Sequence, residues 1–382
     1  MRRNRRRLEP EKEIDACGLF GVMDRSGKRF DGNTVIDAMK NMKVRGNGLG
    51  GGFAAYGLYP QYADQYGIHV MFEKGSEEAK KEVEEFLERN FNIVHEEEVP
   101  TNPDAPVDDP PLVWRYFVDP PRREDGKISD DDYVVSRVMH INTQIKDAFV
   151  FSSGKNMAVF KGVGFPEDIA EFFLLDEMYE GYIWTGHSRF PTNTQGWWGG
   201  AHPFCILDWT VAHNGEISSY GTNRRYLEMF GYYCTLHTDT EVIAYAVDLL
   251  MRRQQLPIEV VSKIFGPPMW YLIDHMDEKK QKLYTALRQV YAPLLVNGPF
   301  TFVMAHHGEM FGLTDRIRLR PITAGEKDDF IYMSSEEAAI RAVSPDLDGV
   351  WTPHGGEPII GRLWKDEEKK KKEQVILENA FR

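Results

Sequence analysis

The sequence is short of cysteine, of positive charge and of long apolar runs. Only 3 of its 382 residues are cysteines, and positions 17, 205 and 234 do not have the spacing of a metal site. The formal net charge of −13 argues against a nucleic-acid-binding protein. No apolar run approaches the ~20 residues that cross a membrane. These absences predict a globular protein of the reducing cytoplasm, with no bound metal, no nucleic-acid partner and no membrane partner.

Both ends of the chain are polar. Five arginines within the first seven residues are followed by an acidic stretch, Glu9 to Asp15, whereas a signal peptide needs an apolar segment there. We therefore expect residues 1–16 to be a leader or propeptide. We expect residues 361–382, which contain the lysine-rich run 365–372, to be a charged tail. A single large domain is predicted over residues 17–360.

Residues 66–152 differ from their surroundings, because short apolar runs alternate there with amphipathic charged stretches. The pattern predicts strand, helix, strand, strand, helix and strand, with the helices over 77–90 and 130–145. Proline-rich acidic loops separate several of these elements. This order is typical of a ferredoxin-like βαββαβ unit, which we interpret as a subdomain inserted into the larger domain.

Cys17 opens an apolar, glycine-punctuated run that continues to Val22. A cysteine nucleophile needs a base within hydrogen-bond reach, because only the thiolate attacks. Cleavage of the Ala16–Cys17 bond would free an α-amine with a pKa of about 7.7–8.0, which can accept the thiol proton. Cys17 is therefore a candidate catalytic residue. The alternative is a small buried cysteine at the start of a core strand.

Three further stretches carry polar side chains suited to a substrate. Arg189 precedes a turn rich in hydroxyl and amide groups, which suits bidentate capture of a carboxylate. Asn214 and Gly215 can aim two hydrogen-bond donors at one oxyanion, or can simply form a hairpin turn. Asp239 stands at a predicted helix start, where it can bind an ammonium group or cap the helix.

A fourth stretch, Arg45-Gly46-Asn47-Gly48, has glycines on both sides of an asparagine. Glycines allow tight backbone turns, which would bring Arg45 and Gly46 against the nucleophile. A surface turn with a solvated arginine is the alternative. The combined set of nucleophile, carboxylate clamp, oxyanion hole and ammonium acceptor fits an α-amino acid with a side-chain amide, which describes glutamine.

Six motifs in this order resemble class II glutamine amidotransferases, which are N-terminal-nucleophile hydrolases. They are Cys-Gly-Leu-Phe-Gly at 17–21, Arg45-Gly46, Gly-His-Ser-Arg-Phe at 186–190 with Thr192-Asn193-Thr194, Ala-His-Pro-Phe at 201–204, Ala-His-Asn-Gly-Glu-Ile at 212–217, and Thr-Asp-Thr-Glu at 238–241. Within the family, Asp315-Arg316 and Leu319-Arg320-Pro321 are most similar to the glutaminase domain of glutamate synthase.

The resemblance implies an α+β fold, a four-layer αββα sandwich, with Cys17 at the mature N-terminus. It implies that Arg189 holds the glutamine α-carboxylate, with backbone help from Thr192 and Asn193, and that Asp239 holds the α-amine. Asn214 and Gly215 would form the oxyanion hole. Cys17 would attack the amide carbon to give a γ-glutamyl thioester and ammonia, and water would then release glutamate. No cofactor in this chain is needed for these steps.

The sequence departs from large glutamate synthases, whose single chain also carries a flavin and iron–sulfur synthase region. This chain is too short for that region and lacks a cluster-forming cysteine set. We therefore expect a separate amidotransferase subunit that passes ammonia to a synthase subunit, with FMN and iron–sulfur centres possible in that partner. Two alternatives stay open: a non-catalytic or glutamine-sensing partner with an uncleaved leader, and an amidase of the same fold with another substrate.

Overall fold

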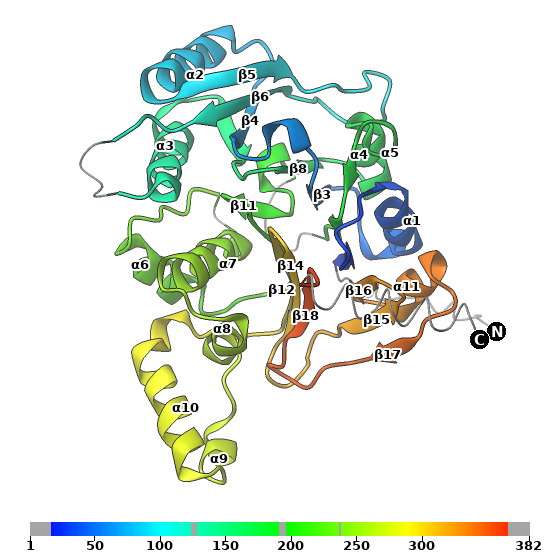
Figure 1. Ribbon diagram of the computed structural model, residues 1–382, viewed down its shortest axis with the longest axis vertical. Helices are drawn as coiled ribbons and strands as arrows, with labels where there is room; N and C mark the ends of the chain where they lie inside the picture. The colour runs from blue at the N-terminus through cyan, green and yellow to red at the C-terminus, as the bar shows by residue number, and fades with distance from the viewer. Residues whose placement is uncertain (1–16, 124–127, 191–195, 237, 366–382) are drawn as a thin grey trace, which may run out of the picture.

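The computed structural model describes residues 17–123, 128–190, 196–236 and 238–365, and its centre is a pair of facing antiparallel sheets (Figure 1). The seven-stranded sheet has the order β17 (Gly349–Trp351), β15 (Thr323–Lys327), β16 (Phe330–Ser334), β1 (Gly18–Asp24), β10 (Ile183–Ser188), β3 (Gly51–Tyr56) and β8 (Met157–Gly162). The five-stranded sheet has the order β11 (Phe204–Ile206), β12 (Trp209–Gly215), β13 (Phe300–His306), β14 (Glu309–Thr314) and β18 (Ile359–Arg362).

Helices cover the outer face of each sheet. The seven-stranded sheet packs against α1 (Asn33–Asn41), α4 (Pro166–Phe172) and α11 (Glu337–Val343), and short α5 (Leu175–Met178) lies beside α4. The five-stranded sheet packs against α7 (Asp239–Val247), which also contacts α6 (Tyr220–Glu228). Helix α7 continues into the π-helical segment 248–253, and α8 (Ile258–Phe265) lies next to that segment. Two more helices, α9 (Trp270–Ile273) and α10 (Glu278–Val290), project away from the sandwich (Figure 1). The predicted α+β class and four-layer αββα order are therefore confirmed.

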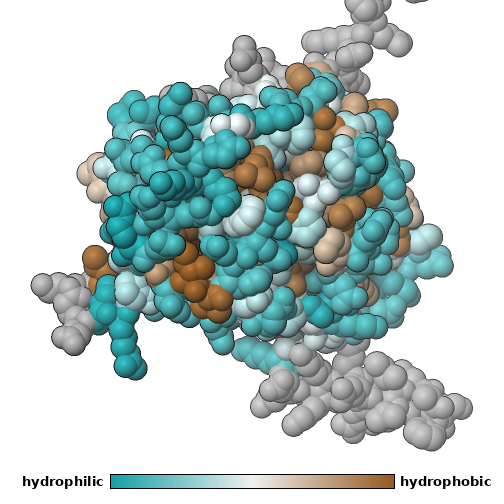
Figure 2. All heavy atoms as spheres, turned by 90° about the horizontal axis from the view of Figure 1, so that it is seen from above, coloured by the Kyte–Doolittle hydropathy of each residue, from teal (hydrophilic) through white to brown (hydrophobic). Residues whose placement is uncertain are grey.

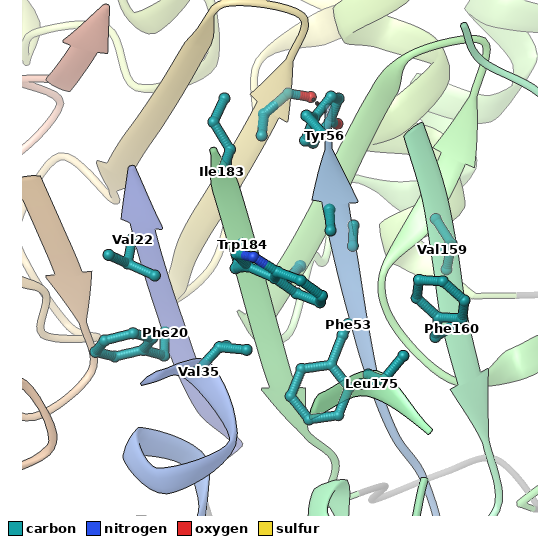
Figure 3. Packing of buried hydrophobic residues seen from close by; sticks show 14 of the residues in the cluster. Phe20, Val22, Val35, Phe53, Tyr56, Val159, Phe160, Leu175, Ile183 and Trp184 are labelled. Atoms are coloured by element: carbon teal, nitrogen blue, oxygen red, sulfur yellow. Dashed lines mark hydrogen bonds between the residues drawn. The ribbon is translucent and has the colours of Figure 1, made fainter. Parts of the chain in front are cut away.

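Strand β1 shows why the apolar run after Cys17 lies at the centre. Every residue of β1 is buried, since helices cover one face and the second sheet covers the other. In Figure 3, Phe20 of β1 lies with Val35 of α1 and near Trp184 of β10. On the opposite face, a Cβ on Gly21 would lie 2.8 Å from the Met310 sulfur, so a larger residue would push the sheets apart.

The inserted segment forms its own sheet and core. Its elements are β4 (Tyr66–Phe72), α2 (Glu77–Asn90), β5 (Asn92–Glu98), β6 (Leu112–Asp119), α3 (Asp130–Gln144) and β7 (Ala148–Ser152). All strand pairs are antiparallel in the order β5-β6-β4-β7, and this order confirms the predicted ferredoxin-like βαββαβ unit. Strands β4 and β7 lie against β8, and β7 also contacts β11. Figure 2, seen from above, shows a mainly hydrophilic surface with separate apolar patches on this side.

One predicted boundary is wrong. The tail was expected to begin at residue 361, but β18 continues to Arg362 as the outer strand of the five-stranded sheet. Leu363 packs against the main core, and the Trp364 N–H donates to the Arg25 carbonyl at 2.8 Å. The apolar residues that follow Gly361 explain this extension, because they can still be buried. In the part of the chain that the structure describes, no helix is long and apolar enough to cross a membrane.

Candidate active site

The predicted site residues gather at one end of the sandwich because neighbouring strands run antiparallel. Cys17 comes directly before β1, and Arg189 comes directly after β10, whose Ser188 pairs with Gly18. Asn214 and Gly215 end β12, where they pair with Thr301 and Phe300 at the start of β13. Cys17 and Thr301, which are 284 residues apart in sequence, therefore lie at the same edge.

The Cys17 thiol is held among backbone and cationic groups. The Phe190 N–H donates to Sγ at 3.3 Å. Burial raises the pKa of the Cys17 thiol, and the Phe190 N–H and the charges of Arg189 and Arg320 act in the opposite direction. Because the net direction is upward, the resting thiol is protonated at neutral pH and needs a base before it can attack.

The Cys17 carbonyl accepts hydrogen bonds from two side chains. Asn214 Nδ2 donates to it at 2.9 Å, and Arg45 Nη1 donates at 3.5 Å. Arg45 Nε is in turn paired with the Glu336 carboxylate. An amide nitrogen has two hydrogens, so Asn214 can hold Cys17 and donate to a second oxygen as well. This contact places the predicted oxyanion donor beside the predicted nucleophile.

Two glycines are required for this close approach. Gly215 has φ +145°, and a Cβ there would lie 2.0 Å from the Pro299 carbonyl oxygen. A Cβ on Gly46 would lie 2.0 Å from Ser188 Oγ. Asn214 and Gly215 therefore belong to the end of a paired strand, and the hairpin-turn alternative for them is wrong.

Arg189 and Asp239 lie near enough for their charges to interact, and the Arg189 charge also acts on Cys17. Asp239 is the first residue of α7, while the cap itself is the Thr238 hydroxyl. The Asp239 carboxylate accepts from the Ile217 N–H at 2.9 Å. Burial raises the pKa of Asp239, but His213, the Ile217 N–H and the Thr240 hydroxyl outweigh burial and hold it below its usual range. The carboxylate is thus ionised and suited to an ammonium group. Thr192 and Asn193 lie outside the described residues.

Beneath the site is a buried histidine cluster, His187, His202 and His213. The rings of His187 and His202 stack with centroids 4.1 Å apart, and His187 Nε2 is 3.0 Å from the His213 carbonyl. His213 Nδ1 is 3.0 Å from the Thr240 hydroxyl. Burial lowers the pKa of His187 to about 3 and holds the pKa of His202 well below its usual range. These two rings are neutral at physiological pH and support the site through packing and hydrogen bonds.

Sequence reasoning missed several groups at this edge. The Phe190 N–H carries no sequence signal, because any residue except proline supplies one. Glu336, the partner of Arg45, is 291 residues away and is brought in only by the pairing of β16 with β1. Asp315 and Arg320 belong to the motif over 315–321, and the sequence alone assigns no role to either residue. Among the described residues, no group of three or more His, Cys, Asp or Glu side chains is arranged to hold a metal ion.

The profile of the class-II glutamine amidotransferases matches residues 53–347. The chain belongs to this family. The matched region contains Arg189, Asn214, Gly215 and Asp239, and it begins after Cys17 and Arg45.

Several relatives of this glutamine amidotransferase cover different shares of the chain. An uncharacterized protein of Archaeoglobus fulgidus is 70% identical over 374 residues, 98% of this chain and 99% of its own length. The glutamate synthase [NADPH] large chain of Bacillus subtilis is 24% identical over 431 residues, 94% of this chain but 27% of its own length. Among solved structures, a glutamine phosphoribosylpyrophosphate amidotransferase from B. subtilis has a TM-score of 0.45 at 15% identity, covering 92% of this chain and 48% of that chain.

Proposed function

We propose that this chain hydrolyses glutamine to glutamate and ammonia through a γ-glutamyl thioester on Cys17. The observation that carries the proposal is the 2.9 Å hydrogen bond from Asn214 to Cys17, with Arg189 and Asp239 close enough to act on the same space. A cation and an ionised carboxylate match the α-carboxylate and α-ammonium of an amino acid. Family membership supports glutamine as that amino acid.

The reaction begins with removal of residues 1–16, which frees the α-amine of Cys17 as the base. That amine takes the thiol proton, and the sulfur attacks the amide carbon of glutamine. The oxyanion accepts hydrogen bonds from Asn214 and the Gly215 N–H. The C–N bond breaks as the amine returns its proton to the leaving nitrogen, so ammonia departs. A water molecule then adds to the thioester, and glutamate leaves as the thiol reforms.

The proposed fate of ammonia is transfer to a separate synthase subunit of the glutamate synthase kind. The likeness to the glutamate synthase large chain supports this, since the match covers a 27% share of that longer protein. The remaining chemistry would then reside in the partner, with FMN and iron–sulfur centres there and no cofactor in this chain.

The decisive experiment is the intact mass of the purified full chain after exposure to an electrophilic glutamine analogue. We expect loss of residues 1–16 and one adduct that maps to Cys17, and no adduct in Cys17→Ala. An unmodified full-length chain that releases no ammonia from glutamine would contradict the proposal. It would favour the glutamine-sensing or non-catalytic alternative.

The amino-acid clamp has its own test. Asp239→Asn removes the charge that would face the glutamine ammonium, and a charged hydrogen bond contributes roughly 1.5–3 kcal/mol. We expect the KM for glutamine to rise about 10-fold to 100-fold, with a smaller change in kcat. Steady-state ammonia release measures both constants, and Asp37→Asn, on the exposed face of α1, is the matched control. An unchanged KM would favour an amidase that does not recognise an amino acid.

A further inference from the structure

We propose that Glu336 is a positioning residue for Cys17, because its carboxylate holds the Arg45 guanidinium against the Cys17 carbonyl. Glu336 lies after β16 and directly before α11. Arg45 ends the short 3₁₀ helix Lys43–Arg45, which follows α1, and α1 packs against α11. The two side chains therefore meet beside the start of β1. The inference rests on the proposed function only for the reaction in which Cys17 takes part.

Two buried serines fix the backbone that carries Glu336 to β1. The Ser335 N–H donates to the Leu19 carbonyl at 3.0 Å, and Ser335 Oγ accepts from the Leu19 N–H at 3.1 Å. The Ser334 hydroxyl donates to the same carbonyl at 3.1 Å and accepts from the Glu336 N–H at 3.1 Å. These hydrogen bonds set the position of Glu336 relative to Leu19, which is two residues from Cys17.

The Arg45 side chain connects Glu336 to Cys17. Its Nε is paired with the Glu336 carboxylate, and its Nη1 donates to the Cys17 carbonyl at 3.5 Å. A guanidinium is planar and carries its five N–H groups in a fixed arrangement, so an ion pair at Nε sets the direction of the other donors. Because 3.5 Å is long for a hydrogen bond, the contact with Cys17 depends on this orientation.

Cys17 needs such support because it precedes the strand. Strand β1 begins at Gly18, which pairs with Ser188, whereas the Cys17 carbonyl accepts from the side chains of Asn214 and Arg45. Removal of residues 1–16 would also make Cys17 a chain end. A misplacement of about 1 Å at a reacting group can lower turnover about 100-fold, so even a small movement of Cys17 matters.

The ion pair contributes more to this placement than to the stability of the fold. The Glu336 side chain is 37% exposed, and ion pairs at exposed positions add little to the free energy of unfolding. Strand β1 is held on both sides by its pairing with β10 and β16. Loss of the Glu336 carboxylate should therefore reduce turnover without unfolding the protein.

The test is a double-mutant cycle in the full chain, with kcat for glutamine expressed per molecule whose intact mass shows loss of residues 1–16. We expect Glu336→Ala to lower kcat about 5-fold to 20-fold through misplacement of the nucleophile. The KM for glutamine and the midpoint of urea denaturation should stay unchanged. In an Arg45→Ala background, Glu336→Ala should have no further effect, because Glu336 acts through Arg45.

Two further variants sharpen the cycle. Glu336→Gln keeps an acceptor oxygen for Arg45 and should recover part of the lost kcat. Glu337→Ala is the matched control, because Glu337 is the next residue but pairs with Arg341 at 2.6 Å on an exposed part of α11, and it should keep wild-type kcat. Equal losses from Glu336→Ala in the wild-type and Arg45→Ala backgrounds would overturn the proposal. If the alanine variant does not fold, the same cycle with Glu336→Gln decides by the same criterion.

Crystal structures test the contact without turnover. We expect Arg45 to leave the Cys17 carbonyl in Glu336→Ala and to stay on it in Glu337→Ala. An Arg45 that keeps this contact in Glu336→Ala would overturn the proposal. If the wild type releases no ammonia from glutamine but Arg45 moves as expected, the positioning role of Glu336 stands and the proposed function is contradicted.

Discussion

Two arginines, Arg115 and Arg320, show how the same side chain serves different ends in this molecule. Arg115 lies on β6, where the inserted subdomain meets the sandwich, and its guanidinium is 2.6 Å from Glu97 and 3.2 Å from the hydroxyls of Tyr59 and Tyr179. Its charge also lies over the Tyr59 ring, 5.1 Å from the centroid. Arg320 is anchored through its backbone carbonyl, and its charge lowers the pKa of the Cys17 thiol, against the larger effect of burial. The Arg115 guanidinium bonds to groups of both the subdomain and the sandwich and so fastens these two parts of the fold, whereas Arg320 is held through its backbone.

The largest effect on activity is expected for a substitution at the edge of the sandwich where the predicted site residues meet. Asn214→Ala should lower glutaminase kcat by ~10²–10³, because one oxyanion donor is lost. The free energy of unfolding should fall by only about 1 kcal/mol, since Arg45 still donates to the Cys17 carbonyl. Ammonia release and urea denaturation measure the two effects.

The control for that variant is Asn92→Ala, on an exposed position of β5 in the inserted sheet, which should alter neither quantity. A loss of kcat below 10-fold in Asn214→Ala would mean that the amide merely orders the N-terminus of β1.

At the junction with the subdomain, we expect a large loss of stability and no loss of kcat. Arg115→Met should lower the free energy of unfolding by about 2–3 kcal/mol, because the charged hydrogen bonds to Glu97 and the two tyrosines are lost. Glu97 is 37% exposed, so water would partly solvate its carboxylate and limit the loss. The folded variant should keep wild-type kcat. Arg89→Met, on the exposed side of α2, is the control for urea denaturation, and equal destabilisation of both variants would refute the fastening role.

The last effect appears only when the pH is changed, and it concerns the buried Lys161 on β8. Lys161 is 1% exposed, donates to the Gly199 carbonyl at 2.9 Å and lies over the Phe204 ring. Burial lowers the pKa of Lys161 to about 7. The unfolded lysine titrates near 10.4, so between those values the unfolded chain binds more protons and stability rises with pH, by at most ~1.4 kcal/mol per pH unit.

Lys161→Met should therefore remove this rise between about pH 7 and pH 10. The cost of burying the ammonium is fully present below about pH 7, so the variant should gain relative stability there. Urea denaturation at a series of pH values measures the slope, and Lys146→Met at an exposed position is the control. A slope that persists in Lys161→Met would assign the pH dependence to other groups.

The inserted unit was predictable from local patterns, whereas the four-layer fold was implied by the resemblance of the motifs to class II glutamine amidotransferases. Strand and helix periods, proline-rich loops and glycine pairs are all visible within a few residues of each other. The wrong tail boundary has a local cause too, since residues 361–364 are too few to show a strand pattern.

The contacts of the candidate site were less predictable, because they depend on register between distant strands. Arg189 and Asp239 could be proposed from their chemistry, but not the pairing of Arg45 with Glu336 or the Phe190 N–H on the Cys17 sulfur. The sequence around Arg115 gives no indication of its role, because its partners come from β5 and from two loops of the sandwich. The roles assigned to Cys17, Asn214 and Asp239 stay predictions until the experiments above are done.

The position of the inserted sheet has a consequence for the behaviour of the protein in solution. Strands β8 and β11 are the outermost strands of the two sheets on that side, and their unpaired backbone groups would be templates for strands of other molecules. Strand β7 of the subdomain lies against both of them, and β4 lies against β8. We infer that the insertion limits edge-to-edge association of molecules. A shortened variant in which a glycine linker replaces residues 66–152 should self-associate through these edges even if its sandwich still forms.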